Sequence, residues 1–424
     1  MNIRSDAFPV GGEHLTAASR PRKRKTVLVH AMNYAPEKTG AGRYTGDIAG
    51  HFAAMGMAVT VVTTPPHYPA WEVDRGYGNR YASRIEDGIT VVRVPLILRP
   101  GARLWRLLAP ASFAASAAPV VLWQILRKRP DVVFCVEPTL LGAPFALLAA
   151  KLVGARTVLH VHDLEIDAAF AMGHLGKHRW LMRVGEFFET AVRKRFDIVV
   201  TISRRMAEKL LEKGVAADRV AVVRNWVDLS AIFPLPGASP YRDELGYADE
   251  DFVVLYSGNL GAKQGLDLLI EAARTLQGVQ GIRFVIGGDG PAKAELERLG
   301  SVLGNVRFLP LQPAHRFNEF LNMADLHLLP QRRGAADLLL PSKLGALLAS
   351  GKPVVVTADP ETELATFVGD AALVIPPEDP AALVSTILKV RSGALRTRPD
   401  HGKELCRTLA RGDGLAAMLS IVDR

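Results

Sequence analysis

The feature that most constrains this chain is a regular alternation of short apolar runs with longer helical stretches. The runs are rich in Val, Ile and Leu without polar alternation, which is typical of parallel strands covered by helices on both faces. The expected strands are Thr26–His30, Val59–Thr63, Ile89–Val94, Val132–Val136, Thr157–His162, Ile198–Ile202, Val220–Val223, Phe252–Ser257, Arg283–Gly287, Val306–Leu309, Leu326–Leu329, Pro353–Thr357 and Leu373–Ile375. The sequence therefore predicts an α/β fold with parallel sheets.

A Pro- and Gly-rich stretch, Phe233–Pro240, interrupts this rhythm and is typical of a linker. The length of 424 residues suits two domains rather than one. We therefore predict two Rossmann-like lobes over residues 26–235 and 245–395, and a C-terminal helix within 396–424 that packs back on the first lobe. The ligand of such a pair is expected in a cleft between the carboxyl ends of the two sheets.

Composition argues against several functional classes. The formal net charge is +9, and part of the excess lies in residues 1–25, which we expect to be a disordered basic tail. No compact basic stripe with interleaved aromatic residues follows the tail, so nucleic acid is not an expected partner. Cys135 and Cys406 lie far apart, without a disulfide framework or metal-ligand spacing, which favours a reducing, cytosolic location.

An uncharged segment, residues 107–126, does not fit the strand–helix rhythm. It is long enough to span a membrane, but it contains two prolines, and a span would place strands of one sheet on opposite sides of the bilayer. A pair of helices buried within the protein is an alternative interpretation of this segment. We favour peripheral membrane contact through residues 99–129, with Trp105, Phe113 and Trp123 in the lipid and the flanking basic residues at the headgroups.

Two segments of the second lobe have the composition of a diphosphate site. In the first, Gly258, Asn259 and Gln264 belong to a small-residue turn in which Lys263 supplies a cation. A solvent-facing lysine in an ordinary loop is the alternative interpretation.

The second segment, Leu340–Pro353, is expected to form a short helix. We expect Pro341 to precede it, Ser342 to be its N-cap and Lys343 to lie in its first turn. Free N–H groups at a helix start favour an anion, although a capped core helix would give the same pattern.

The first lobe offers weaker candidates. Gly40–Gly46 follows the first strand and would let the backbone approach an anion, but it does not match a dinucleotide-binding fingerprint. His162 and Asp163 fall at the carboxyl end of a strand, where site residues cluster, whereas His160 is expected to be a hydrogen-bonded core histidine. Asp289, in a glycine-rich turn, is expected to be a turn former.

Taken together, these segments resemble the retaining glycosyltransferases of family 4, which have the GT-B fold. The narrower likeness is to enzymes of bacterial exopolysaccharide, colanic-acid and O-antigen synthesis. The motifs that carry it are Asn33–Glu37, Pro66–Pro69, Lys263–Gly265, Arg333–Asp337 and Pro341–Lys343.

The resemblance implies that Lys263 contacts the donor diphosphate, that Gly42 lies beneath the phosphate, and that His162, which Asp163 follows, contacts the donor sugar. His162, Asp163 and Lys263 are therefore the expected catalytic residues. Many members of the family have an arginine where Asn259 stands, so Lys343 is expected to take its place.

The paired glutamates of the family would fall at Leu338 and Ala346, and neither residue is acidic. Asp337 lies one residue away from Leu338, and either Glu361 or Glu363, after the strand that ends near Val356, is a candidate for the ribose contact.

The implied activity is transfer of a hexosyl group, with 6-deoxyhexoses among the candidates, from a nucleoside diphosphate sugar to a lipid-linked glycan intermediate. The enzyme would retain configuration and act at the cytoplasmic face of the membrane. Lys263, Lys343 and helix dipoles would stabilise the leaving diphosphate, so neither a metal nor a cofactor is expected. A sugar-nucleotide 2-epimerase of the same fold and a non-catalytic nucleotide-sugar binding protein are the alternatives.

Overall fold

The computed structural model describes residues 24–37, 40–68, 70–98, 108–137, 140–163, 179–333 and 340–424. Most of the expected basic tail, together with Trp105, Asp337 and Leu338, lies outside the described residues. The last two residues of the expected tail belong to the fold instead. Arg24 Nε donates to the carbonyl of Gly56 at 2.7 Å, and Lys25 Nζ donates to the carbonyl of Val422 at 2.6 Å.

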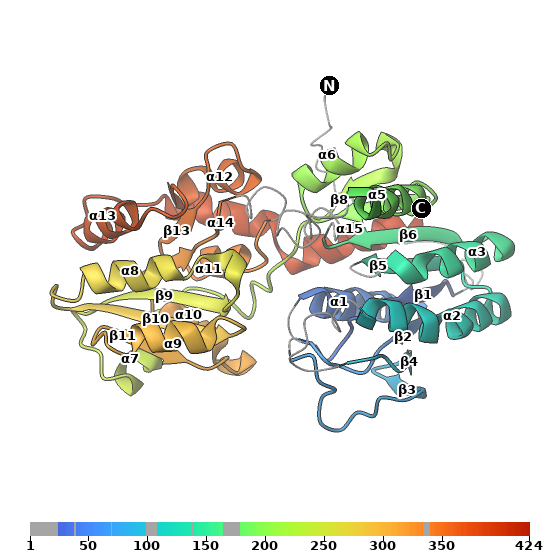
Figure 1. The fold of residues 1–424 in the computed structure, drawn as a ribbon, viewed down its shortest axis with the longest axis horizontal. Helices are drawn as coiled ribbons and strands as arrows, with labels where there is room; N and C mark the ends of the chain where they lie inside the picture. The colour runs from blue at the N-terminus through green and yellow to red at the C-terminus, as the bar shows by residue number, and fades with distance from the viewer. Residues whose placement is uncertain are drawn as a thin grey trace, which may run out of the picture.

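The strands of the first lobe are β1 (Thr26–His30), β2 (Ala58–Thr63), β3 (Ala82–Glu86), β4 (Ile89–Arg93), β5 (Val132–Glu137), β6 (Arg156–Val161), β7 (Ile198–Thr201) and β8 (Val220–Val222). Those of the second lobe are β9 (Phe252–Asn259), β10 (Ile282–Asp289), β11 (Val306–Leu309), β12 (Leu326–Leu329), β13 (Val354–Thr357) and β14 (Leu373–Ile375). The two lobes lie side by side (Figure 1).

The sheet orders are β3-β4-β2-β1-β5-β6-β7-β8 and β11-β10-β9-β12-β13-β14. Both are doubly wound, so the strand order reverses beside β1 and beside β9, and ligands of such sheets lie at the carboxyl ends of those strands. The predicted strands are all present, which confirms the α/β class. We missed only β3, a polar, largely exposed edge strand that pairs antiparallel with β4.

The helices of the first lobe are α1 (Gly40–Ala54), α2 (Leu108–Lys128), α3 (Ala143–Val153), α5 (Arg179–Arg193) and α6 (Arg204–Glu212). The later helices are α7 (Pro240–Glu244), α8 (Asp267–Thr275), α9 (Lys293–Gly300), α10 (Phe317–Asn322), α11 (Leu344–Ala349), α12 (Glu363–Val368), α13 (Pro380–Arg391), α14 (Pro399–Thr408) and α15 (Arg411–Asp423). Short 3₁₀ turns are η2 (Leu140–Gly142), η3 (Ala217–Arg219), η4 (Ala262–Gln264), η5 (Ala314–Arg316) and η6 (Gly369–Ala371).

Helices on both faces of each sheet explain the unbroken apolar character of the strands. In β1, Leu28 packs into the cluster beneath α2 and α3, whereas Val27 and Val29 pack into the cluster beneath α1. In β9, Val253 and Val254 likewise enter opposite clusters. Successive side chains of a strand point to opposite faces of the sheet, so each strand contributes side chains to the hydrophobic cores on both faces.

The chain passes between the lobes twice, and the two connecting segments are hydrogen-bonded to each other through their backbones. Val227 N donates to the carbonyl of Leu409, and Arg411 N donates to the carbonyl of Val227, both at 2.9 Å. Ile232 and Tyr241 already pack in the core of the second lobe. The first crossing therefore lies at Val227, before the expected boundary at 235.

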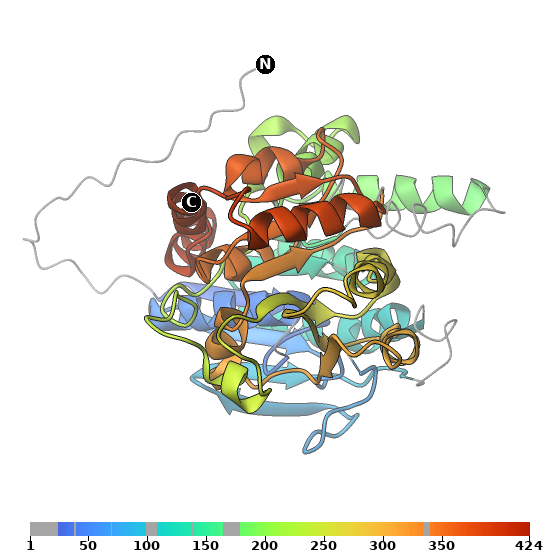
Figure 2. The same cartoon turned by 90° about the vertical axis from the view of Figure 1, so that its left-hand side faces the viewer.

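Two helices, rather than the one expected, follow the second lobe. α14 packs on α11 of the second lobe, and α15 then crosses and packs on α1 of the first lobe (Figures 1 and 2). The end of the chain thus fastens the lobes together.

The uncharged segment forms α2, a single 21-residue helix with Pro119 inside it. It is the one helix among the described residues that is long and apolar enough to cross a membrane, by length and composition. However, it packs along α3 on a sheet that contains both β4 and β5, the strands on either side of it in sequence. Phe113 is buried, so the expectation that it enters lipid is wrong.

Candidate functional site

Lys343, just before α11, lies on the end of strand β9. Its Nζ donates to the Tyr256 hydroxyl at 2.8 Å and lies 4.3 Å from the centre of the Tyr256 ring. The side chain passes over Gly258, where a Cβ atom would come within 2.6 Å of the Lys343 Nζ. Gly258 is therefore needed so that this lysine can reach the strand end.

Burial lowers the pKa of Lys343 from 10.5 to about 7. The desolvated ammonium has the ring and hydroxyl of Tyr256 as partners, and a carboxylate is not among them. A phosphate placed here would supply the missing counter-charge and favour the protonated form.

The Lys263 side chain is exposed in η4, and the Lys263 carbonyl accepts a hydrogen bond from Arg332 N at 3.0 Å. Asn259 and Gln264 converge over Gly261, where a Cβ atom would meet the side chains of both. Gln264 Oε1 is buried without a hydrogen-bond partner among the described residues. The turn thus presents an exposed cation and an unused acceptor beside the end of β9.

The glycine-rich turn after β10 allows two strand ends to approach closely. A Cβ atom at Gly288, where φ is +145°, would fall on the carbonyl oxygen of Gly258. Asp289 Oδ1 accepts a hydrogen bond from Gly290 N at 2.8 Å, so the predicted turn-forming role of Asp289 is confirmed.

Pro341 precedes the helix as expected, but Ser342 is not its N-cap. α11 begins at Leu344, the N-cap position is Lys343, and no side chain caps it. Pro341 closes a turn by accepting a hydrogen bond from Leu344 N at 3.0 Å. Ser342 lies beside the Tyr44 hydroxyl of the other lobe.

In the first lobe, His162 follows β6 and contacts Tyr44. The two rings are stacked with centroids 5.8 Å apart, and burial lowers the pKa of His162 to about 4. The imidazole is therefore neutral at physiological pH, and its buried Nε2 has no hydrogen-bond partner among the described residues. Tyr44, which lies within the segment Gly40–Gly46 and had no predicted role, links His162 to Ser342. Asp163 follows His162 and acts electrostatically on Glu137.

His160 is buried, as expected, but it is not the hydrogen-bonded histidine that we predicted. Neither ring nitrogen has a partner among the described residues, and its ring lies 4.1 Å from that of His162.

Gly42 contacts a carboxylate of the protein itself. A Cβ atom at Gly42 would lie 2.5 Å from Glu37 Oε2. Because a carboxylate at this place repels a phosphate, the placement of Gly42 beneath the donor phosphate is not supported.

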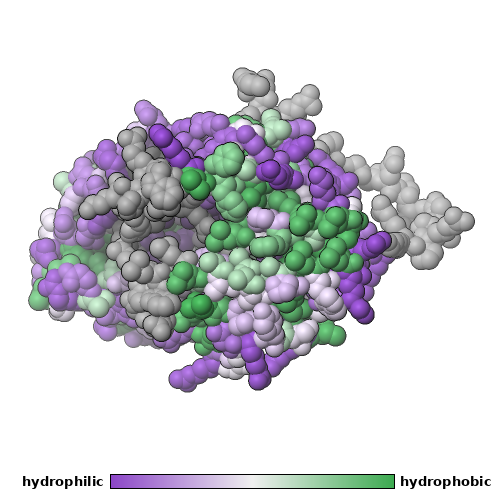
Figure 3. All heavy atoms as spheres, turned by 45° about the vertical axis from the view of Figure 1, so that its right-hand side comes forward, coloured by the Kyte–Doolittle hydropathy of each residue, from purple (hydrophilic) through white to green (hydrophobic). Residues whose placement is uncertain are grey.

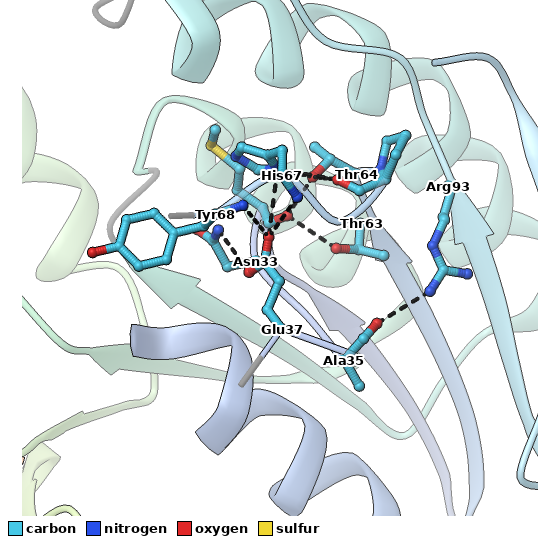
Figure 4. A network of polar contacts seen from close by, with 10 residues as sticks. Asn33, Ala35, Glu37, Thr63, Thr64, His67, Tyr68 and Arg93 are labelled. Atoms are coloured by element: carbon cyan, nitrogen blue, oxygen red, sulfur yellow. Dashed lines mark hydrogen bonds and ion pairs between the residues drawn. The ribbon is translucent and has the colours of Figure 1, made fainter. Parts of the chain in front are cut away.

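Glu37 instead organises the loops after β1 and β2 (Figure 4). The buried carboxylate accepts hydrogen bonds from His67 N and Tyr68 N at 3.0 Å each, and from Asn33 Nδ2 at 2.9 Å. The two first-lobe motifs behind the narrower family likeness are thus joined through one side chain. Both motifs are recognisable in the sequence, but the contact between them through Glu37 is not.

Glu363 faces the first lobe. Its carboxylate accepts hydrogen bonds from Arg204 N at 2.9 Å and Arg205 N at 2.7 Å, in the first turn of α6. Arg224 Nη2 lies 3.4 Å away. The geometry places the Glu363 carboxylate at the lobe interface, where it holds the start of α6, and its expected ribose contact stays a prediction.

Comparison with known proteins decides the family. Residues 39–226 match the family model of the glycosyl transferase 4-like domain, and residues 251–392 match that of glycosyl transferases group 1. WcaI of Escherichia coli (strain K12), a glycosyl transferase assigned to colanic acid biosynthesis, is 42% identical over 372 residues, which cover 85% of this chain and 91% of WcaI. The chain is a family 4 glycosyltransferase.

Solved structures agree on the fold. Sucrose-phosphate synthase from Thermosynechococcus elongatus superposes with a TM-score of 0.73 at 15% identity, over 95% of this chain and 98% of its own. Anabaena HepE in complex with UDP-glucose superposes with a TM-score of 0.66 at 15% identity, over 94% and 99%. The glycosyltransferase therefore has the GT-B fold.

Three features of this glycosyltransferase bear on its chemistry. Lys343 and Lys263 lie on and beside the end of β9, and the neutral His162 lies at the end of β6 in the other lobe, connected to them through Tyr44 and Ser342. Within the described ranges, no group of three His, Cys, Asp or Glu side chains is placed as metal ligands would be. The arrangement offers cations on one side and a hydrogen-bonding imidazole on the other.

Proposed function

We propose that this glycosyltransferase moves a hexosyl group from a nucleoside diphosphate sugar to a lipid-linked glycan intermediate of exopolysaccharide synthesis. It would act at the cytoplasmic face of the membrane and retain the configuration of the sugar. The relatives support the proposal: WcaI carries a name from colanic acid biosynthesis, and HepE holds UDP-glucose.

The observation that carries the proposal is the position of Lys343. An ammonium group desolvated on Tyr256 and Gly258, with the Tyr256 hydroxyl as its hydrogen-bond partner, is suited to an anion that arrives with the ligand. Lys263 lies in the turn after the same strand. The two lysines together would hold a diphosphate, with Lys343 in place of the arginine that the family has at 259.

In the proposed reaction, the bond between the anomeric carbon and the diphosphate oxygen breaks, and its electron pair stays on that oxygen. The acceptor hydroxyl attacks the anomeric carbon, and its proton passes to the leaving phosphate. Lys263 and Lys343 stabilise the charge that develops on the diphosphate, so the proposed mechanism uses no metal ion or other cofactor. His162, being neutral, would hydrogen-bond a hydroxyl of the donor sugar.

The test is replacement of Lys263 by Ala. Loss of one preorganised cation at the leaving group is expected to lower the turnover number by about 10²-fold or more. Transfer of labelled sugar into a membrane lipid extract measures it, and the donor is first identified by thermal shift with a panel of nucleotide sugars.

The matched control is Lys389→Ala, an exposed lysine on α13, which is expected to keep wild-type transfer. Full activity of Lys263→Ala would overturn the diphosphate assignment.

A further inference from the structure

The outer side of α3 bears an unusual row of large apolar side chains. Leu141 of η2 begins the row, and Phe145, Leu148 and Leu152 of α3 follow it at intervals of four, three and four residues. The four side chains are exposed by 44%, 42%, 58% and 69%. The inner side of the helix packs on the sheet through small alanines. A helix that covers a sheet in water normally shows the opposite pattern, with polar residues outward.

The apolar row continues onto the neighbouring helix. α2 packs along α3, and its Trp123 and Leu126 are exposed by 54% and 47%. The guanidinium of Arg127 lies 5.3 Å from the centre of the Trp123 ring. Hydrophobic residues gather on the side of the first lobe where these helices lie (Figure 3). Helix α5, which has the exposed side chains Val184 and Phe187, lies on the same side (Figure 2).

The charged side chains of α2 and α3 have a single sign. Residues 108–130 and 140–157 contain no Asp or Glu. The exposed cations Arg127, Lys128 and Lys151 lie in the last turns of α2 and α3. Both helices lead directly into β5 and β6, so the cations gather at the amino edge of the sheet.

We infer that the outer face of α2 and α3 docks on a lipid bilayer that contains anionic lipids, with the α3 row in the acyl boundary and the basic helix ends among the headgroups. Aromatic and aliphatic side chains beside Arg and Lys are the composition that binds such a surface. A second copy of the chain would present the same positive face and be repelled. This differs from the contact through residues 99–129 that the sequence predicts, because Phe113 is buried and α3 carries the exposed row.

The inference deepens the proposed function, since a lipid-linked acceptor requires the enzyme to reach the membrane. Its test does not use catalysis: vesicle binding reports on the surface, and transfer to a soluble glycan acceptor reports on the site. Failure of one is therefore distinguishable from failure of the other.

The full-length protein is sedimented with vesicles of phosphatidylethanolamine and phosphatidylglycerol, and with vesicles of phosphatidylcholine alone. We expect binding to the anionic vesicles that weakens with added salt. The double variant Leu148→Gln and Leu152→Gln is expected to bind at least about tenfold more weakly. In the wild type, both leucine side chains leave water and enter the bilayer on binding, and this gain is lost in the variant. Both positions are exposed, so the fold should be unaffected.

The control double variant is Val302→Gln and Leu311→Gln, two exposed apolar residues of the second lobe, which should bind as the wild type does. A charge variant, Arg127→Gln with Lys151→Gln, should weaken binding and remove most of its salt dependence. Wild-type protein that stays in the supernatant, or a Leu148/Leu152 variant that sediments fully, would overturn the inference. A wild-type dimer that this variant dissociates would overturn it too, by assigning the face to self-association.

Discussion

At Lys343, the surroundings of one side chain set its charge. Its pKa is about 7 in the folded protein, whereas the ordinary pKa of a lysine side chain is 10.5. Between these values the unfolded chain binds more protons, so burial of Lys343 makes the free energy of unfolding rise as the pH rises through this window. Ligand binding has the opposite dependence, because a diphosphate prefers the protonated lysine.

We therefore expect the affinity for a nucleoside diphosphate to fall by about tenfold between about pH 8 and about pH 9. The phosphates do not titrate in this range, whereas binding requires Lys343, whose pKa is about 7, to take up a proton, which becomes tenfold less favourable with each pH unit. Calorimetry at both pH values measures the change. Lys343→Met should bind weakly with little pH dependence, and an equal slope in the variant and the wild type would refute the assignment.

Among the strands, the ends of β9 and β10 pack without room for a side chain. A methyl group at Gly288 would overlap the carbonyl oxygen of Gly258 and would also require φ of +145°. Gly288→Ala is therefore expected to lower the free energy of unfolding by about 2–4 kcal/mol. Denaturant unfolding followed by circular dichroism measures it.

Gly50 in α1 is the matched control, since a Cβ atom there would have no heavy atom within 4 Å. Gly50→Ala should stabilise the protein by about 0.5–1 kcal/mol, because alanine loses less backbone entropy in a helix. Similar effects at the two positions would show that contact with Gly258 does not matter.

For the whole molecule, Glu363 joins the lobes by accepting hydrogen bonds from the first turn of α6. Glu363→Ala leaves two N–H groups and Arg224 without this partner, at an expected cost of about 1–3 kcal/mol. We expect the thermal unfolding transition to move to lower temperature or to split, while donor affinity stays near that of the wild type.

Differential scanning calorimetry and donor titration separate this role from a ribose contact. Glu361→Gln, an exposed neighbour, is the control and should change neither property. If Glu363→Ala weakened donor binding without altering the unfolding transition, the carboxylate would belong to the donor site after all.

The sequence by itself determined the two parallel sheets, because apolar strand runs such as Thr26–His30 and Val354–Thr357 are typical of strands covered on both faces, and both runs are buried. Its short-range motifs also predicted the family, which the comparisons confirmed, and they proposed the segments around Lys263 and Lys343 as the diphosphate site. It missed β3, whose polar side chains reflect an exposed edge rather than a core.

Only the tertiary structure decided which groups meet. It placed Lys343 on Tyr256, Glu37 on the backbone of His67, Glu363 on α6 and Tyr44 beside Ser342, all contacts between segments distant in sequence. The same holds for α2 and α3, since composition gives the apolar residues but not the side of each helix that faces the sheet. Pairing across the fold depends on how helices and strand ends pack, and a local pattern of residues does not contain that information.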